Sequence, residues 1–113
     1  MINWNQVKQL EKDVGAEDLA EVVTLFLSEV DEAVEGLDEV SKGTSKEIAD
    51  ALHFLKWSAS NLGFQSFGNY CSAGETQAHV GDTSQISVSQ VESLYAASKA
   101  QFRAELQQNC AIE

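Results

Sequence analysis

Residues 44–63, TSKEIADALHFLKWSASNLG, carry the clearest fold signal in this sequence. Apolar residues recur there every three or four positions, which is the spacing of one face of an α-helix. The recurring residues are Ile48, Leu52, Leu55, Ala59 and Leu62. Thr44 and Glu47 match the capping-box pattern of a helix start, and Gly63 is suited to a helix end. The stretch therefore predicts a helix whose apolar stripe other helices must cover.

The segment before this stretch predicts a long helix that ends near Val40. Its apolar positions again follow the helical spacing; they are Leu19, Val22, Val23, Phe26, Val30, Val34 and Leu37. We expect Gly43 to act as a left-handed C-cap. Many acidic residues lie between the apolar ones, and a solvated helix face explains them better than a metal site does, because they lack the loop geometry of a calcium site.

Three more helices are predicted in the rest of the chain. A short one, residues 3 to about 12, has Asn3 as its N-cap and should cover one end of the core. Another begins about Gln65, and its buried face contains Phe67, Cys71, Gly74 and Ala78. The last begins after Ser87 or Ser89, with a buried side formed by Val91, Leu94, Tyr95, Phe102 and Leu106. Residues 80–86 between them are polar and predict a loop.

These helices predict an all-α fold, namely an antiparallel four-helix bundle with a short additional N-terminal helix. The chain has 113 residues, which fits a single domain over residues 1–113. It has no proline, which favours long uninterrupted helices.

The composition narrows the class of protein. The formal net charge is −11, and such an acidic surface repels nucleic acids and anionic membranes. Two cysteines are too few for a disulfide framework. No signal peptide or membrane span is evident, so we expect a cytoplasmic protein. Nothing in the sequence calls for a dimer, and we expect a monomer. Two histidines and two cysteines without close spacing predict no metal site.

His53 is expected to lie on the outer side of its helix, about 140° from the apolar stripe when each residue turns by 100°. Lys56 follows one turn later, and Trp57 and Ser60 share the same outward sector. Phe54 also lies off the stripe. Exposed aromatic residues around an ionisable one indicate a docking surface, although a helix buried on two sides would explain Phe54 as well.

At His53 the sequence resembles a known family. Residues 53–63, HFLKWSASNLG, are similar to the signature of histidine phosphotransfer (HPt) domains, roughly H-x-L-K-G-S-S-x-x-L-G. Ala51, Leu52 and Cys71 match as well, and the predicted helices fit the family along nearly the whole chain. The resemblance implies a four-helix bundle with an exposed, phosphorylated histidine midway along one helix.

The resemblance also implies roles for neighbouring residues. Glu75 corresponds to the family residue that holds the second nitrogen of the histidine, and a solvated surface acid is the alternative. Lys56 is expected near the phosphoryl oxygens, where it would offset their charge. His79, the only other histidine, is expected to be an exposed surface residue. Trp57 stands where the family commonly has glycine, so it either crowds the approach of a partner or helps to select one.

The function that follows is that of a phosphocarrier rather than an enzyme. A free-standing protein of this family is expected to accept a phosphoryl group on His53 from the aspartate of one receiver domain and pass it to another receiver. The sequence has no nucleotide-binding loop and no magnesium site, so Mg²⁺ should come with the partner and no cofactor is expected. The alternative is a helical adaptor that binds receivers or kinases without being phosphorylated, with Trp57 blocking transfer.

Overall fold

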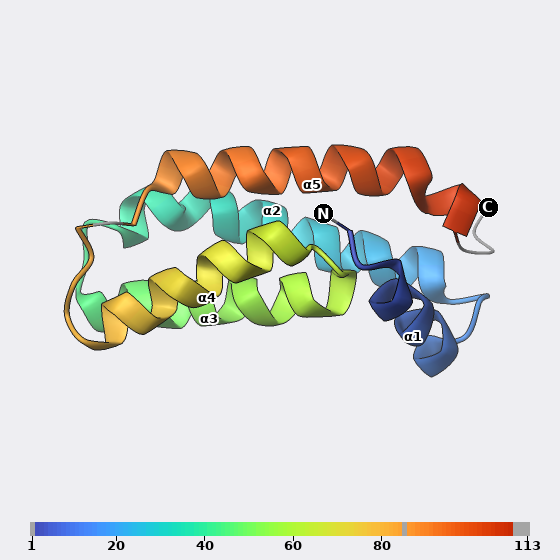
Figure 1. The fold of residues 1–113 in the computed structure, drawn as a ribbon, viewed down its shortest axis with the longest axis horizontal. Coiled ribbons are helices and arrows are strands. Elements are labelled where there is room, and N and C mark those ends of the chain that lie inside the picture. Colours follow the sequence, from blue (N-terminus) through green and yellow to red (C-terminus); the bar gives the residue numbers. More distant parts are fainter. Residues whose placement is uncertain (1, 85, 110–113) are drawn as a thin grey trace.

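Five helices make up this chain in the computed structural model, which describes residues 2–84 and 86–109. They are α1 Trp4–Val14, α2 Leu19–Val40, α3 Ser45–Leu62, α4 Gln65–His79 and α5 Val88–Asn109. Helices α2 to α5 run up and down along the 43 Å length of the molecule, and α1 lies across one end (Figure 1). The predicted all-α bundle with a short additional N-terminal helix is therefore confirmed. That residues 1–113 form a single domain stays a prediction.

The ends of α3 are set by local hydrogen bonds that the sequence predicts. The backbone N–H of Glu47 donates to the Thr44 hydroxyl at 3.1 Å, and the Glu47 carboxylate accepts from the Thr44 N–H at 3.2 Å. This capping box satisfies backbone donors that the first turn leaves unpaired. At the other end, Gly63 has a φ of +73°, the left-handed conformation of a helix C-cap. Helix α3, which carries His53, therefore has fixed ends.

The end of α2 differs from the prediction. Gly43 is not among the described glycines with positive φ, so the expected left-handed C-cap is wrong. Ser41 caps the helix in a right-handed conformation, and its hydroxyl donates to the Asp38 carbonyl at 2.6 Å. The N–H groups of Ser41, Lys42 and Gly43 bond to carbonyls of the last turn. Because right-handed turns already satisfy these carbonyls, no left-handed residue is needed.

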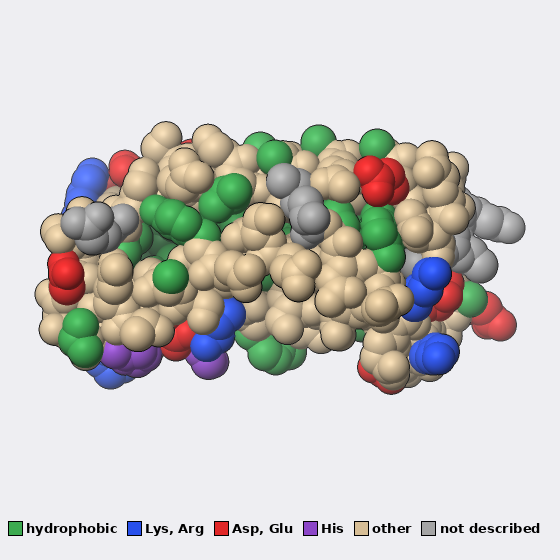
Figure 2. All heavy atoms as spheres, viewed as in Figure 1, with side chains coloured by type: hydrophobic (Ala, Val, Ile, Leu, Met, Phe, Trp, Pro, Cys, Tyr) green, Lys and Arg blue, Asp and Glu red, His purple; other side chains and the backbone are tan. Residues whose placement is uncertain are grey.

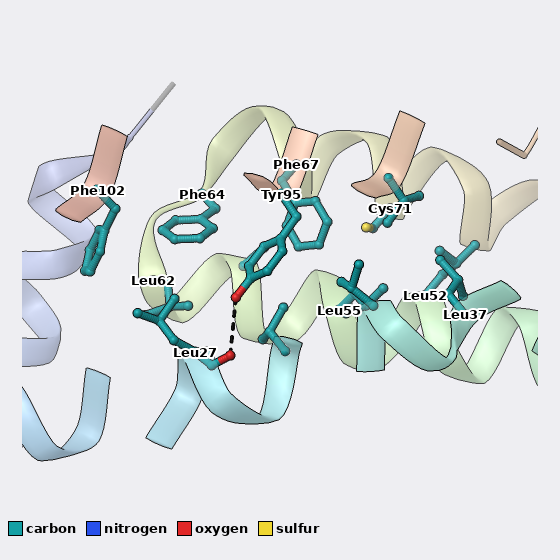
Figure 3. Close-up of a cluster of buried hydrophobic side chains, with 14 of the residues drawn as sticks. Leu27, Leu37, Leu52, Leu55, Leu62, Phe64, Phe67, Cys71, Tyr95 and Phe102 are labelled. Atoms are coloured by element: carbon teal, nitrogen blue, oxygen red, sulfur yellow. Dashed lines mark hydrogen bonds between the residues drawn. The ribbon is translucent and has the colours of Figure 1, made fainter. Parts of the chain in front are cut away.

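The core runs the length of the bundle between its four long helices. Figure 3 shows a cluster of leucine and aromatic side chains drawn from α2, α3, α4 and α5, with Phe64 from the α3–α4 turn among them. On α2 the buried residues are Leu19, Val23, Leu27, Val30, Val34 and Leu37. Leu27 was not predicted to be buried, and Val22 and Phe26, which were predicted to lie in the core, are half-buried. On α5, Leu94 and Leu106 are likewise only half-buried.

Helices α3 and α4 approach each other closely because two glycines of α4 face α3. A Cβ atom at Gly74 would lie 3.0 Å from Leu52 Cδ1, and one at Gly68 would lie 3.2 Å from Ala59 Cβ. Real Cβ contacts are rarely so short, so a larger residue at either position would require its neighbour on α3 to shift. The two glycines lower the helix propensity of α4, and the close packing of α3 against α4 offsets this cost.

A polar cluster connects α5 to α2, away from the contact between α3 and α4. The Tyr95 hydroxyl lies 3.2 Å from the Leu27 carbonyl (Figure 3) and 2.6 Å from Asp31 Oδ1. Lys99 Nζ donates to both carboxylate oxygens of Asp31, at 2.8 and 2.9 Å. Burial by itself would raise the pKa of Asp31, but the hydrogen bonds from Lys99 and Tyr95 bring it below its usual value. The cluster fixes the register between α2 and α5.

Candidate functional site

His53 lies in the middle of α3, with its side chain 62% exposed, as the helical spacing predicts. Its Nδ1 atom lies 2.9 Å from Oε2 of Glu75 on α4. An ionised carboxylate can only accept hydrogen bonds, so Nδ1 must carry the proton in this contact. In the neutral ring Nε2 then holds a lone pair, and neutral imidazole nitrogen is a nucleophile near neutral pH.

Glu75 lies on the buried face of α4, one residue after Gly74, and only 8% of the residue is exposed. A carboxylate buried this far needs hydrogen bonds or opposite charges around it. The hydrogen bond from Lys56 lowers the pKa of Glu75 against the opposing effect of burial, and bonds from His79 and His53 lower it further. Glu75 is therefore ionised at neutral pH.

Lys56 follows His53 by one turn of α3, and its Nζ lies 2.6 Å from Glu75 Oε1. Lys56 and His53 therefore contact different oxygens of one carboxylate. The lysine side chain is 37% exposed, so Lys56 is partly accessible from the protein surface. The contact between His53 and Glu75 that the resemblance implies is present, and it brings Lys56 into the same cluster.

A comparison with protein families identifies the family of the chain that carries this cluster. The sequence profile of the Hpt domain matches residues 21–110, which covers nearly all of α2 and the whole of α3 to α5 and includes His53, Lys56 and Glu75. The chain belongs to the Hpt domain family. No curated protein and no solved structure matches it. Membership supports a histidine phosphotransfer role in a phosphorelay and interaction with receiver domains, and Hpt domains are phosphocarriers rather than enzymes.

In this Hpt domain His79 also joins the cluster. Its Nε2 lies 3.3 Å from Oε2 of Glu75, the same oxygen that contacts His53. The side chain is 62% exposed, so the expectation of an exposed residue is correct, but the contact was missed. The available signal was the spacing, because His79 follows Glu75 by four residues on one helix and such residues are neighbours. Figure 2 shows histidine, acidic and basic side chains gathered along the lower edge of the molecule.

The three residues predicted to dock partners lie in different surroundings. Trp57 is 53% exposed and its ring packs against Phe26 of α2, with 5.8 Å between ring centroids. Phe54 is half-buried and lines a shallow hollow together with residues of α2, so α3 is covered on two sides there. Ser60 is exposed and lines a hollow of about 290 Å³ together with Lys56. Of the three, Trp57 is thus the exposed aromatic side chain.

The described residues also bear on two other kinds of site, a metal centre and a membrane span. No group of three or more histidine, cysteine, aspartate or glutamate side chains in the described ranges could hold a metal ion. None of the described helices has the length and apolar character that crossing a membrane requires. Cys71 is buried in the core, and burial raises the pKa of its thiol to about 12, so it is not a reactive thiolate. Cys110 lies outside the described residues.

Proposed function

We propose that this Hpt domain accepts a phosphoryl group on Nε2 of His53 from the aspartyl phosphate of one receiver domain and passes it to the aspartate of a second receiver. The observation that carries the proposal is the 2.9 Å contact between His53 Nδ1 and Glu75 Oε2 on an imidazole that is 62% exposed. The contact holds one ring nitrogen by its proton, while the exposure leaves room for a partner to reach the ring.

In the accepting step, the Nε2 lone pair of His53 attacks the phosphorus atom of the aspartyl phosphate. The N–P bond forms as the P–O bond to the aspartate breaks, and the bonding electron pair leaves with the aspartate carboxylate. The ring becomes an imidazolium because Nδ1 keeps its proton, and Glu75 stabilises this positive charge through the hydrogen bond. The onward step is the reverse reaction with the second receiver, and it returns His53 to the neutral ring.

Lys56 is proposed to contact the phosphoryl oxygens once the group is on His53. Its ammonium lies beside Glu75, one helical turn from the imidazole, and a long flexible side chain can turn from the carboxylate towards a new anion. The Mg²⁺ that phosphoryl transfer uses is proposed to be bound by the receiver domain, beside its aspartate. The Hpt domain itself would contribute the nucleophile, its orientation and one positive charge.

The proposal is tested by mixing the protein with receiver domains carrying labelled phosphate, in the presence of Mg²⁺. Label that moves to the protein, and that is stable to alkali but lost in acid, is the expected result because a phosphohistidine has this stability. A second, unlabelled receiver added afterwards should then take up the label. If no receiver of a broad panel labels the protein but several bind it, the adaptor alternative replaces the proposal.

Replacing Glu75 by alanine should slow labelling of His53 by roughly 10- to 100-fold, which corresponds to losing one hydrogen bond to a charged group of about 1.5–3 kcal/mol. Without the carboxylate, nothing selects the Nδ1–H form of the ring or stabilises the imidazolium. Rates of label uptake from one receiver measure the effect. Glu75→Gln is the matched control, because its carbonyl oxygen can still accept from Nδ1. Equal rates in wild type and Glu75→Ala would contradict the role of Glu75.

Truncating Trp57 to glycine should change the choice among receivers. The exposed ring is of the kind that anchors interfaces, and losing such an anchor costs about 1–2 kcal/mol, or roughly 5- to 30-fold in the transfer rate with the affected receiver. Transfer rates measured across a receiver panel test this. Trp57→Ala separates the loss of the ring from the added flexibility of glycine, and Leu25→Ala removes another exposed apolar residue from α2. An unchanged profile across the panel would rule out docking through Trp57.

A further inference from the structure

Two histidines on different helices contact the same oxygen atom of Glu75. His53 on α3 contacts Glu75 Oε2 at 2.9 Å, and His79 on α4 contacts the same atom at 3.3 Å. Lys56 occupies the other oxygen. Within the described residues, the hydrogen bonds and ion pairs of Glu75 therefore run to three basic groups and to no acidic one.

When one oxygen accepts hydrogen bonds from two N–H donors, each of the two bonds is weaker than a bond from a single donor would be. Each donor withdraws negative charge from the carboxylate, so a second donor weakens the first bond. The ionised carboxylate only accepts, so the Nε2 atom of His79 must donate in this contact. The contact of His79 therefore lessens the stabilisation that Glu75 provides to a positive charge on His53.

We propose that His79 is a positioning residue that acts through Glu75: by sharing Oε2 it limits the stabilisation of the phosphorylated His53 ring and so favours onward transfer. The inference rests on the proposed function, because it concerns the charge that His53 carries while phosphorylated. The phosphorylated ring is an imidazolium when Nδ1 is protonated, whereas the ring left after transfer is neutral. A carboxylate with a fuller negative charge stabilises the first state more than the second.

Removing the side chain should therefore make the phosphoryl group harder to pass on. In His79→Ala, the ratio of onward to reverse transfer rates between His53 and a receiver is expected to fall roughly 2- to 10-fold, the equivalent of one modest hydrogen bond. His79→Gln should restore most of the ratio, because its amide N–H can reach the same carboxylate. Both variants should fold normally, because the side chain is exposed at the end of α4.

A second readout needs no phosphorylation. In the unphosphorylated protein, the NMR signal of the His53 Nδ1 proton should move downfield in His79→Ala, since its hydrogen bond to Oε2 strengthens, and return towards the wild-type position in His79→Gln. Thr76→Ala is the matched control on the same helix, because among the described residues the Thr76 hydroxyl bonds only to the Ser72 carbonyl of α4. That variant should change neither the signal nor the ratio.

The two proposals fail in different ways. If the wild-type protein takes no label from any receiver, the proposed function is wrong. The NMR comparison would still show whether the contact of His79 with Glu75 weakens the hydrogen bond between Glu75 and His53. If the wild type is labelled but His79→Ala leaves both the His53 proton signal and the transfer ratio as they were, His79 has no positioning role. A ratio that rises in His79→Ala would also overturn the inference.

Discussion

His53→Gln should abolish labelling by phosphorylated receivers while leaving the fold intact. Glutamine has no lone pair of comparable nucleophilicity at this position, so the accepting step has no route. The imidazole is 62% exposed and lies outside the core, and the glutamine amide can still donate to Glu75, so the change in the free energy of unfolding should stay within about 1 kcal/mol. Label uptake measures the first effect, and circular dichroism with denaturant unfolding measures the second.

The other histidine gives a matched comparison for this variant. His79→Gln makes the same substitution on the neighbouring helix, and we expect that variant to take label, because His53 and its contact with Glu75 are still present. If label persists in His53→Gln and disappears in His79→Gln, the phosphoryl group is carried by His79 and not by His53. Unfolding of His53→Gln would instead show that the residue belongs to the core, against its exposed position.

Gly63→Ala should strongly destabilise the protein. Gly63 has a φ of +73°, and a Cβ atom there would lie 2.5 Å from the backbone oxygen of Asn3. The left-handed conformation costs alanine about 1–2 kcal/mol, and the clash with a backbone atom adds to it. We expect a loss of about 2–4 kcal/mol in the free energy of unfolding, because the Asn3 N–H also bonds to the Gly63 carbonyl at 2.7 Å.

Gly36→Ala is the control for this change. Gly36 lies inside α2, is exposed, and has nothing within 4 Å of the position that its Cβ would occupy. Alanine there should stabilise the protein by about 0.5–1 kcal/mol through helix propensity alone. Denaturant unfolding of both variants tests the pair. A Gly63→Ala variant as stable as the wild type would show that the turn between α3 and α4 is not held as described.

The sequence predicts best the features that depend on near neighbours in the chain. The capping box of Thr44 and Glu47, the end of α3 at Gly63 and the outward direction of His53 all follow from local rules of helix geometry. The contact of Glu75 with His53 joins two helices, and it was reached only through the resemblance to HPt domains. Helical spacing alone identifies Glu75 as one acid among many.

The features that sequence reasoning missed depend on how the helices pack. Leu27 belongs to the buried core, where the Tyr95 hydroxyl of α5 bonds to its carbonyl, whereas Phe26 is half-buried at the side of α2, next to the Trp57 ring of α3. The spacing of apolar residues on α2 cannot show which other helix packs against each of its faces. The contact of His79 with Glu75 was missed for a different reason, because exposed histidines are usually ordinary surface residues and only the position of Glu75 gives this one a partner.

The atom that carries the phosphoryl group can be identified by NMR of the ¹⁵N-histidine-labelled protein after phosphorylation by a receiver, and this measurement tests the role of His53 most directly. We expect a single phosphorylated nitrogen, Nε2 of His53, with Nδ1 still hydrogen-bonded to Glu75. A phosphoryl group on Nδ1 of His53 would contradict the role of Glu75, because that atom is the one the carboxylate holds. A phosphoryl group on any other residue would contradict the central claim that His53 is the carrier.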